Sequence, residues 1–234
     1  MKYSMDRFRR EKAAIRRLLN RISQGEGMHL DFKYHIDDAA RIARSLCAFA
    51  NSEGGSLLVG VKDNGRIVGV ETSEELYVVE SANDRHLRPS LSLRFEEWKY
   101  RDKVVLEVHV PKAQRKPVFV LDTDRKWRAY FRDGNQNVRA PLPWVKGMLQ
   151  RYGKRKLRFS YTSSLRQLIL FFQRNAEPAT LAHIQHLTRL PFPTLLNDLA
   201  TLVAFDLLAI DFDQMKYRYR MREDTMHVVW KKEK

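Results

Sequence analysis

The chain has 234 residues, which suits one large domain or two small ones. Hydrophobic residues make up 44% and aromatic residues 11%, which is enough to form packed cores and excludes a wholly disordered chain. The longest stretch without a charged residue, 178–188, has only 11 residues, whereas a membrane span needs about 20 apolar ones. The single cysteine, Cys47, excludes an intrachain disulfide and fits a reducing compartment. We therefore expect a cytoplasmic protein with no membrane partner.

Positive charge is concentrated in three segments. The chain carries 43 basic and 28 acidic residues, a formal net charge of +15. Residues 1–24 hold eight basic and two acidic side chains, residues 146–158 hold six basic and none acidic, and residues 216–234 hold seven basic and three acidic. Clustered cations are typical of proteins that bind a polyanion, because each neutralised phosphate releases counterions. The alternative interpretation is a solvated surface that only keeps the protein soluble.

The first 55 residues predict two helices. Residues 3–22 place apolar side chains at near-helical spacing with arginines on the other face, which predicts a basic amphipathic helix over 1–24. Asp37 or Asp38 is expected to cap a second helix, which should end at Asn51 to Gly55.

Strands are predicted next. The apolar run 56–61 predicts a buried strand, and Asn64-Gly65 predicts a hairpin turn into residues 67–70. Alternating apolar residues near 91–95, 104–110 and 127–131 predict further strands. We therefore expect an α+β domain over residues 25–145 with a mixed or mostly antiparallel sheet.

The remainder of the chain has a helical pattern. Residues 146–162 predict a basic helical linker. From residue 163 the pattern gives three short helices and then two β-prone runs, 207–210 and 217–220. Three helices followed by a two-stranded wing are typical of a winged helix-turn-helix, which we assign to residues 163–234.

Four segments resemble the Schlafen-type AlbA-like domain. Residues 26–33 (EGMHLDFK) are similar to the family pattern E-x-x-x-x-E-F-K, with Asp31 in place of its second glutamate. Residues 48–55 (AFANSEGG) resemble A-F-A-N-T-x-G-G, residues 58–70 resemble G-V-x-D-x-G-x-I-x-G-V, and residues 129–135 resemble Y-x-R-x-G-S. The resemblance implies an AlbA-like α/β domain over residues 25–145 that binds nucleic acid. The sequence contains no G-x-x-x-x-G-K-[ST] loop, so ATP binding is not expected.

Cationic side chains are the candidates for phosphate contacts, because such donors position a nucleic-acid backbone. For Lys33, Arg132 and Arg139 the alternative role is a surface ion pair. The predicted nucleic-acid-binding residues come from the AlbA-like domain, the linker and the wing: Lys33, Arg132, Arg139, Lys154, Arg155, Lys156, Lys216, Arg218 and Arg220.

The resemblance also implies a candidate nuclease site. In Schlafen proteins that cleave RNA, three acidic residues of these motifs form the site, and they correspond here to Glu26, Asp31 and Asp63. Converging carboxylates would suit Mg²⁺ or Mn²⁺. The alternative is structural, with Asp31 in an ion pair and Asp63 capping a turn. We favour the structural role, since Asp31 is one methylene shorter than glutamate, and expect no cofactor.

The third predicted helix of the winged helix-turn-helix, residues 193–204, contains no lysine or arginine. The cations of the wing suit contacts to the backbone or minor groove better than base reading. We predict a DNA-binding transcriptional regulator, with DNA favoured over RNA. The alternatives are a metal-dependent endoribonuclease and an assembly module whose winged helix binds protein. The apolar face of the helix at 3–22 predicts a homodimer.

Overall fold

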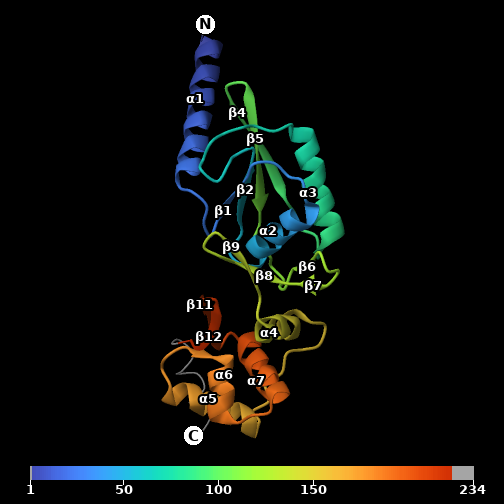
Figure 1. Ribbon diagram of the computed structural model, residues 1–234, viewed down its shortest axis with the longest axis vertical. Coiled ribbons are helices and arrows are strands. Elements are labelled where there is room, and N and C mark those ends of the chain that lie inside the picture. The colour runs from blue at the N-terminus through green and yellow to red at the C-terminus, as the bar shows by residue number, and fades with distance from the viewer. Residues whose placement is uncertain (1, 223–234) are drawn as a thin grey trace. The chain divides into compact units, whose positions relative to one another are not determined.

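The computed structural model describes residues 2–222, with side chains described from residue 9 onward. It divides into two compact units, Met1–Arg139 and Ala140–Lys234 (Figure 1). Each unit has a hydrophobic core of its own. No helix within residues 2–222 is long and apolar enough to cross a bilayer. Residues 223–234, the end of the basic segment 216–234 and of the predicted winged helix-turn-helix, lie outside the described part of the chain.

Unit 1 is built around a four-stranded sheet. Its strands, in spatial order, are β1 (Leu30–Lys33), β2 (Gly55–Val59), β5 (Lys103–Val110) and β4 (Arg94–Tyr100). β1 and β2 are parallel, whereas β2 with β5 and β5 with β4 are antiparallel. The sheet is therefore mixed, as the sequence predicts.

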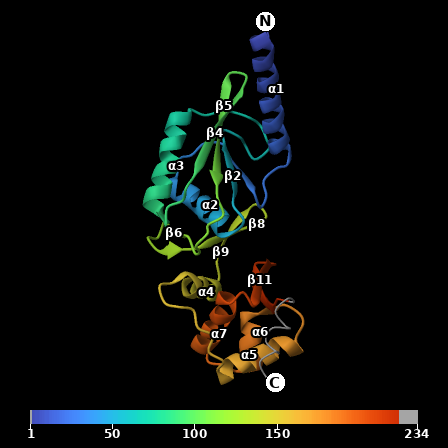
Figure 2. The ribbon, with the colours of Figure 1, turned by 180° about the vertical axis from the view of Figure 1, so that it is seen from behind.

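Helices cover both faces of this sheet, as the front and back views show (Figures 1 and 2). α2 (Ala39–Asn51) and α3 (Thr72–His86) share a core with one face. α1 (Lys2–Ser23) lies on the other face, where Leu18 and Ile22 pack in a core that includes Trp98 of β4. Because successive strand residues point to opposite faces, β2, β4 and β5 contribute to both cores, whereas β1 contributes only to the core beneath α1. α1 is thus part of unit 1 rather than a separate segment.

Two smaller sheets lie near the end of α2. β3 (Leu87–Arg88), β6 (Phe119–Leu121) and β7 (Trp127–Arg128) form one, and β8 (Tyr130–Asp133) and β9 (Gln136–Arg139) form a hairpin. The buried Asn51 side chain connects them to α2. Its Nδ2 donates to the carbonyls of Val118 and Tyr130, at 2.9 and 3.1 Å, and its Oδ1 accepts from the Val118 amide at 2.8 Å. These bonds explain why an asparagine ends the A-F-A-N segment.

The glycine pair after α2 is required by close backbone packing. Gly54 has a φ of +76°, and a Cβ there would lie 2.8 Å from the carbonyl oxygen of Val110. A Cβ on Gly55 would lie 2.5 Å from the Phe49 ring. Side chains would clash at both positions, so the segment accepts only glycine without rearrangement.

Two elements of unit 1 differ from the sequence prediction. Helix α3 was not predicted, because its buried face includes the polar Glu75 and Asn83, which interrupt the apolar periodicity. Glu75 accepts from the Ile36 amide at 3.0 Å, and Asn83 bonds both the amide and the carbonyl of Leu91. The hairpin predicted across Asn64-Gly65 is reduced to an isolated bridge between Val61 and Ile67.

Unit 2 contains four helices and a small sheet within its described residues. They are α4 (Leu142–Tyr152), α5 (Ser163–Arg174), β10 (Ala179–Thr180), α6 (Leu181–Thr188), α7 (Phe192–Ala204), β11 (Leu208–Asp213) and β12 (Lys216–Met221). The sheet order is β10-β12-β11, and all its pairs are antiparallel. The side chains of Thr162 and Thr180 cap α5 and α6.

The predicted linker, residues 146–162, is divided between two kinds of structure. Its first part lies in α4, which packs along α7 and so belongs to the body of unit 2. Residues 153–162 contain no helix. The division between the units falls at residues 139 and 140 rather than at 145, because apolar residues of α4 such as Met148 join the core of unit 2.

Candidate nucleic-acid interface

Asp31 is the centre of a buried charge cluster in unit 1. Strand β1 directs its side chain toward α2, where the residue is only 3% exposed. Asp31 Oδ2 lies 2.8 Å from Lys33 Nζ, and Oδ1 lies 3.1 Å from Arg132 Nη2. Ser45 of α2 lies 3.5 Å from Oδ2. Both carboxylate oxygens are therefore occupied by cations of the protein itself.

Arg132 on β8 is fully enclosed beside Asp31, with a side-chain exposure of 0%. Its Nε donates to the Gly27 carbonyl at 3.0 Å, its Nη2 to the Leu30 carbonyl at 3.3 Å, and its Nη1 to Asn137 Oδ1 at 3.1 Å. A phosphate of a bound nucleic acid cannot reach a guanidinium buried in this way. Arg132 was predicted as a phosphate contact, but its position makes it a structural residue that fastens the β8–β9 hairpin to β1.

Glu26 lies next to Asp31, and the two carboxyl groups share a hydrogen bond. Burial raises the pKa of Glu26, and the hydrogen bond and charge of Asp31 raise it further. Burial acts in the same direction on Asp31, but Lys33, Glu26 and Arg132 outweigh it, so the pKa of Asp31 lies below its ordinary value. Glu26 Oε1 also accepts from the Phe32 amide at 2.9 Å. The two carboxyl groups therefore differ, with the pKa raised on Glu26 and lowered on Asp31.

Asp63 lies apart from Asp31. It is exposed and lines a cleft of about 420 Å³ together with Phe32, Ile22 and Gly65. Phe32 and Asp31 are neighbours on β1 and point to opposite faces of the sheet. The cleft of Asp63 is thus on the α1 side of the sheet, whereas Asp31 faces α2.

This arrangement does not fit the Mg²⁺ or Mn²⁺ that the resemblance implies. Among residues 9–222, Glu26, Asp31 and Asp63 do not form a group of three with ligand atoms within 4.8 Å of one another. Lys33 and Arg132 hold the oxygens of Asp31 that a metal would need.

A cleft of about 440 Å³ opens beside the buried cluster. Lys33 lines it and is about one-third exposed, while Arg41 on α2 has a side-chain exposure of 76% and lies 3.5 Å from Asp38. Arg44 of α2 lines the same cleft and pairs with Asp122. The sequence predicted Lys33 as a phosphate contact but did not predict Arg41 or Arg44. These two arginines are three residues apart on one predicted helix, a spacing that places both on the same helix face. Arg139, also predicted, is exposed at the end of β9.

Unit 2 carries a second, more cationic cleft of about 690 Å³. The predicted residues Lys154, Arg155 and Lys156 line it with Arg158, and all four are exposed. No ion pair is found for these four among residues 9–222. Asp198 of α7 also lines the cleft, and burial raises the pKa of its carboxyl group. The segment 154–158 is therefore a concentration of cations with little compensating negative charge.

Helix α7 offers only a narrow polar stripe to a ligand. Leu195, Leu199 and Leu202 face the core of unit 2. On a neighbouring side α4 packs so closely that a Cβ on Gly147 would lie 2.7 Å from the Ala200 carbonyl oxygen. Lys146 Nζ of α4 also donates to Asn197 Oδ1 at 3.0 Å. α4 thus covers one side of α7.

The cations of the β11–β12 hairpin are largely balanced by its own aspartates. Arg220 Nε lies 2.9 Å from Asp211, and Arg218 Nε lies 3.6 Å from Asp213. Lys216, the third predicted contact there, is exposed and is in register with Asp213. The arginines of the hairpin are therefore partly neutralised, whereas the cations of segment 154–158 are not paired within residues 9–222.

Comparison with known proteins agrees with the motifs. The sequence model of the family described as Schlafen, AlbA_2 matches residues 26–141. One similar solved structure is the DIP2311 protein of Corynebacterium diphtheriae, with a TM-score of 0.42 and 17% identity. The match covers 74% of this chain and 35% of that protein, so the chain spans about a third of its length.

A second similar structure is the N-terminal domain of a protein from Nitrosomonas europaea related to the ATP-dependent DNA helicase RecG. It has a TM-score of 0.38 and 25% identity, and the match covers 45% of this chain and 79% of that domain. The family match agrees with the four sequence motifs and with the mixed sheet of unit 1. Residues 26–141 of this chain are a domain of the Schlafen AlbA_2 family.

Proposed function

We propose that this protein is a nucleic-acid-binding protein whose ligand is duplex DNA and whose role is transcriptional regulation. Membership of residues 26–141 in the Schlafen AlbA_2 family suggests nucleic-acid binding. The observation that carries the proposal is segment 154–158, where four exposed cations line a cleft without an ion-pair partner among residues 9–222. Cations that are not neutralised by the protein bind phosphate and release counterions.

The order of elements in unit 2 supports a winged helix-turn-helix. A helix, a short strand, two helices and a two-stranded hairpin follow one another, and the short strand pairs with the hairpin. In such a domain the last helix usually reads bases. Here α7 lacks lysine and arginine and lies against α4. We therefore assign DNA contact in unit 2 to the phosphate backbone, through segment 154–158.

The salt dependence of binding tests this proposal. Fluorescence anisotropy with a labelled duplex should give an affinity that falls steeply with salt, and about six phosphate contacts correspond to a log-log slope of roughly −5. Single-stranded RNA of the same length should bind more weakly than the duplex. Binding that is absent at about 50 mM salt, or that does not respond to salt, would contradict the proposal.

A charge-matched pair of variants locates the contact. The triple variant Lys154→Gln, Arg155→Gln and Lys156→Gln should reduce the magnitude of the slope by about 3, because each lost phosphate contact removes about 0.9. The control replaces Arg85, Lys99 and Lys126 of unit 1 with glutamine, which removes the same charge from exposed positions. Equal effects of the two triples would mean that only net charge matters. An unchanged slope in the first triple would favour a protein-binding role for unit 2.

A further inference from the structure

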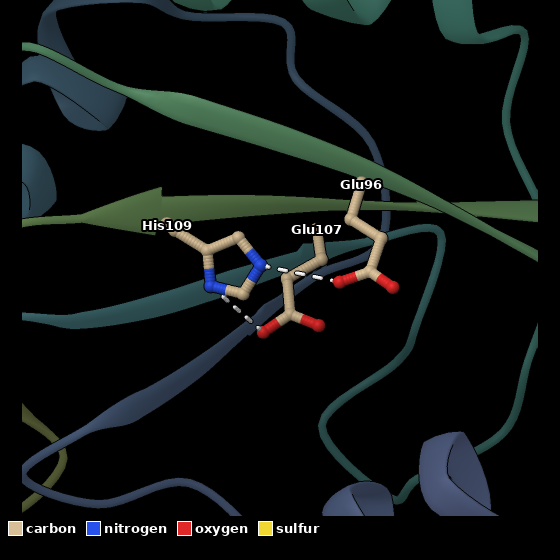
Figure 3. Close-up of side chains that lie close together, drawn as sticks. All are labelled: Glu96, Glu107 and His109. Carbon is tan, nitrogen blue, oxygen red and sulfur yellow. Dashed lines mark ion pairs between the residues drawn. The ribbon is translucent and has the colours of Figure 1, made fainter. Parts of the chain in front are cut away.

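A polar cluster lies on the face of the main sheet that α1 partly covers. Glu96 belongs to β4, and Glu107 and His109 belong to β5. All three share a face with Trp98 and Val105, which pack in the core beneath α1. Figure 3 shows the imidazole beside both carboxylates, with an ion-pair contact to each.

The three side chains are close enough to share one ion. His109 Nε2 lies 3.5 Å from Glu96 Oε2, and His109 Nδ1 lies 3.5 Å from Glu107 Oε1. One ligand atom from each residue lies within 4.8 Å of the other two. No second group of three histidine, cysteine, aspartate or glutamate residues meets this criterion in the described part of the chain.

Glu107 is the unusual member of this cluster, because its side chain is completely buried. Its Oε2 accepts a hydrogen bond from Trp98 Nε1 at 2.8 Å, but its Oε1 accepts none among the described residues. The strand register places Glu96 directly opposite Glu107. Like charges in directly opposed positions are destabilising, and a buried carboxylate oxygen without a donor costs free energy. The cluster therefore contains a buried carboxylate oxygen that accepts no hydrogen bond among the described residues, beside a second carboxylate and an imidazole.

Two arginines lie near the cluster. Arg21 Nη2 of α1 is 3.1 Å from Glu107 Oε1, and Arg94 is opposite His109 in the strand register. Arg21 offsets one of the two carboxylate charges without a well-formed hydrogen bond to Oε1. Within residues 9–222, Glu96 forms an ion pair with His109 only, so its carboxylate has no arginine or lysine partner there.

We propose that Glu96, Glu107 and His109 bind a divalent transition-metal ion of the Zn²⁺ or Mn²⁺ class. An imidazole combined with two carboxylates suits these ions better than Mg²⁺, which prefers oxygen ligands and keeps its water. Ser56 Oγ lies 3.1 Å from His109 Nδ1, where it can accept the Nδ1 proton and leave Nε2 as the ligand atom. Glu96 and His109 have side-chain exposures of 47% and 27%, so an ion can enter from solvent.

The site also links metal binding to α1. A metal on Glu107 Oε1 competes with Arg21, the residue that joins the C-terminal part of α1 to β5. Removing the arginine charge should therefore tighten metal binding, in contrast to removal of a ligand. This opposite sign separates a real site from general surface binding by the other histidines and carboxylates.

Isothermal titration calorimetry with Zn²⁺ and the full chain tests the proposal. The unmodified protein should bind one ion at this site, and Glu96→Gln and His109→Gln should each weaken that binding by at least tenfold. Glu97→Gln is the matched control, because this exposed residue is adjacent on β4 and undergoes the same charge change. Arg21→Gln should bind Zn²⁺ more tightly, and Mg²⁺ should not compete.

Circular dichroism melts of the metal-free variants establish whether each has folded. The proposal is overturned if the unmodified protein shows no saturable Zn²⁺ binding, or if Glu96→Gln and His109→Gln bind like Glu97→Gln. It is also overturned if folded Arg21→Gln loses affinity as the ligand variants do.

Discussion

Replacing Asp31 with asparagine tests whether the acidic residue of the E-x-x-x-x-E-F-K segment is structural. The substitution keeps the shape of the side chain and removes its charge. Arg132 would then be a fully buried cation that retains three neutral acceptors and no counter-ion. Lys33 is about one-third exposed and can turn toward water.

The expected loss of stability follows from these contacts. Breaking a buried ion pair by removing one partner costs about 3 to 5 kcal/mol. Because Arg132 keeps its three other bonds and asparagine keeps one acceptor oxygen, we expect a loss of about 3 kcal/mol, at the lower end of that range. For a unit of this size, that loss lowers the melting temperature by about 9 °C.

Differential scanning calorimetry of the full chain, with urea denaturation, measures the effect. The matched control is Asp37→Asn, because Asp37 is exposed and lines the cleft of about 440 Å³ that Asp31 also lines. This control should change stability by less than about 0.5 kcal/mol. The pKa of Asp31 is lowered in the folded state, so its stabilising contribution is present above the unfolded pKa of about 3.9. The difference in stability between the unmodified protein and Asp31→Asn should therefore shrink as the pH falls through the lowered folded pKa of Asp31.

The reasoning is refuted if Asp31→Asn is as stable as Asp37→Asn, or if the difference grows as the pH falls. A stable Asp31→Asn that has lost Mn²⁺-dependent RNA cleavage shown by the unmodified protein would instead establish the nuclease role.

Three further predictions concern other buried contacts. Because the pKa of Glu26 is raised in the folded state, Glu26→Gln should melt at an equal or higher temperature near neutral pH. The difference should shrink as the pH falls through the raised pKa and vanish below the ordinary pKa of a glutamate. Asp122→Asn removes a buried carboxylate from Arg44 and from the Tyr130 hydroxyl, and urea denaturation should show a loss of about 3 kcal/mol. Gly147→Ala forces a Cβ to within 2.7 Å of α7, so unit 2 should lose about 2 kcal/mol in calorimetry, whereas Gly27→Ala, with nothing within 4 Å, should not.

Several features of this protein follow from the sequence alone. The Asp38 cap and the turn between β11 and β12 are set by neighbours in the chain. The order of elements in unit 2 was also predictable, because each helix has its own apolar stripe and its own break. The positive charge of segment 154–158 follows from composition.

The tertiary structure decided which charges remain available to a ligand. Lys33, Arg132, Arg218 and Arg220 look alike in the sequence as phosphate contacts, but each pairs with a carboxylate. Helix α3 was hidden because its buried polar residues bond to distant backbone rather than following an apolar pattern.

The candidate carboxylates Glu26, Asp31 and Asp63 show most clearly that sequence spacing does not determine which distant side chains meet. Their spacing in the sequence matches a nuclease motif, but Asp31 faces α2, whereas Asp63 lines a cleft with Phe32 on the opposite face of the sheet. Glu96, Glu107 and His109 match no motif and still meet, because adjacent strands bring them to one face. Sequence spacing fixes local geometry, but sheet pairing and strand alternation determine which distant side chains come into contact.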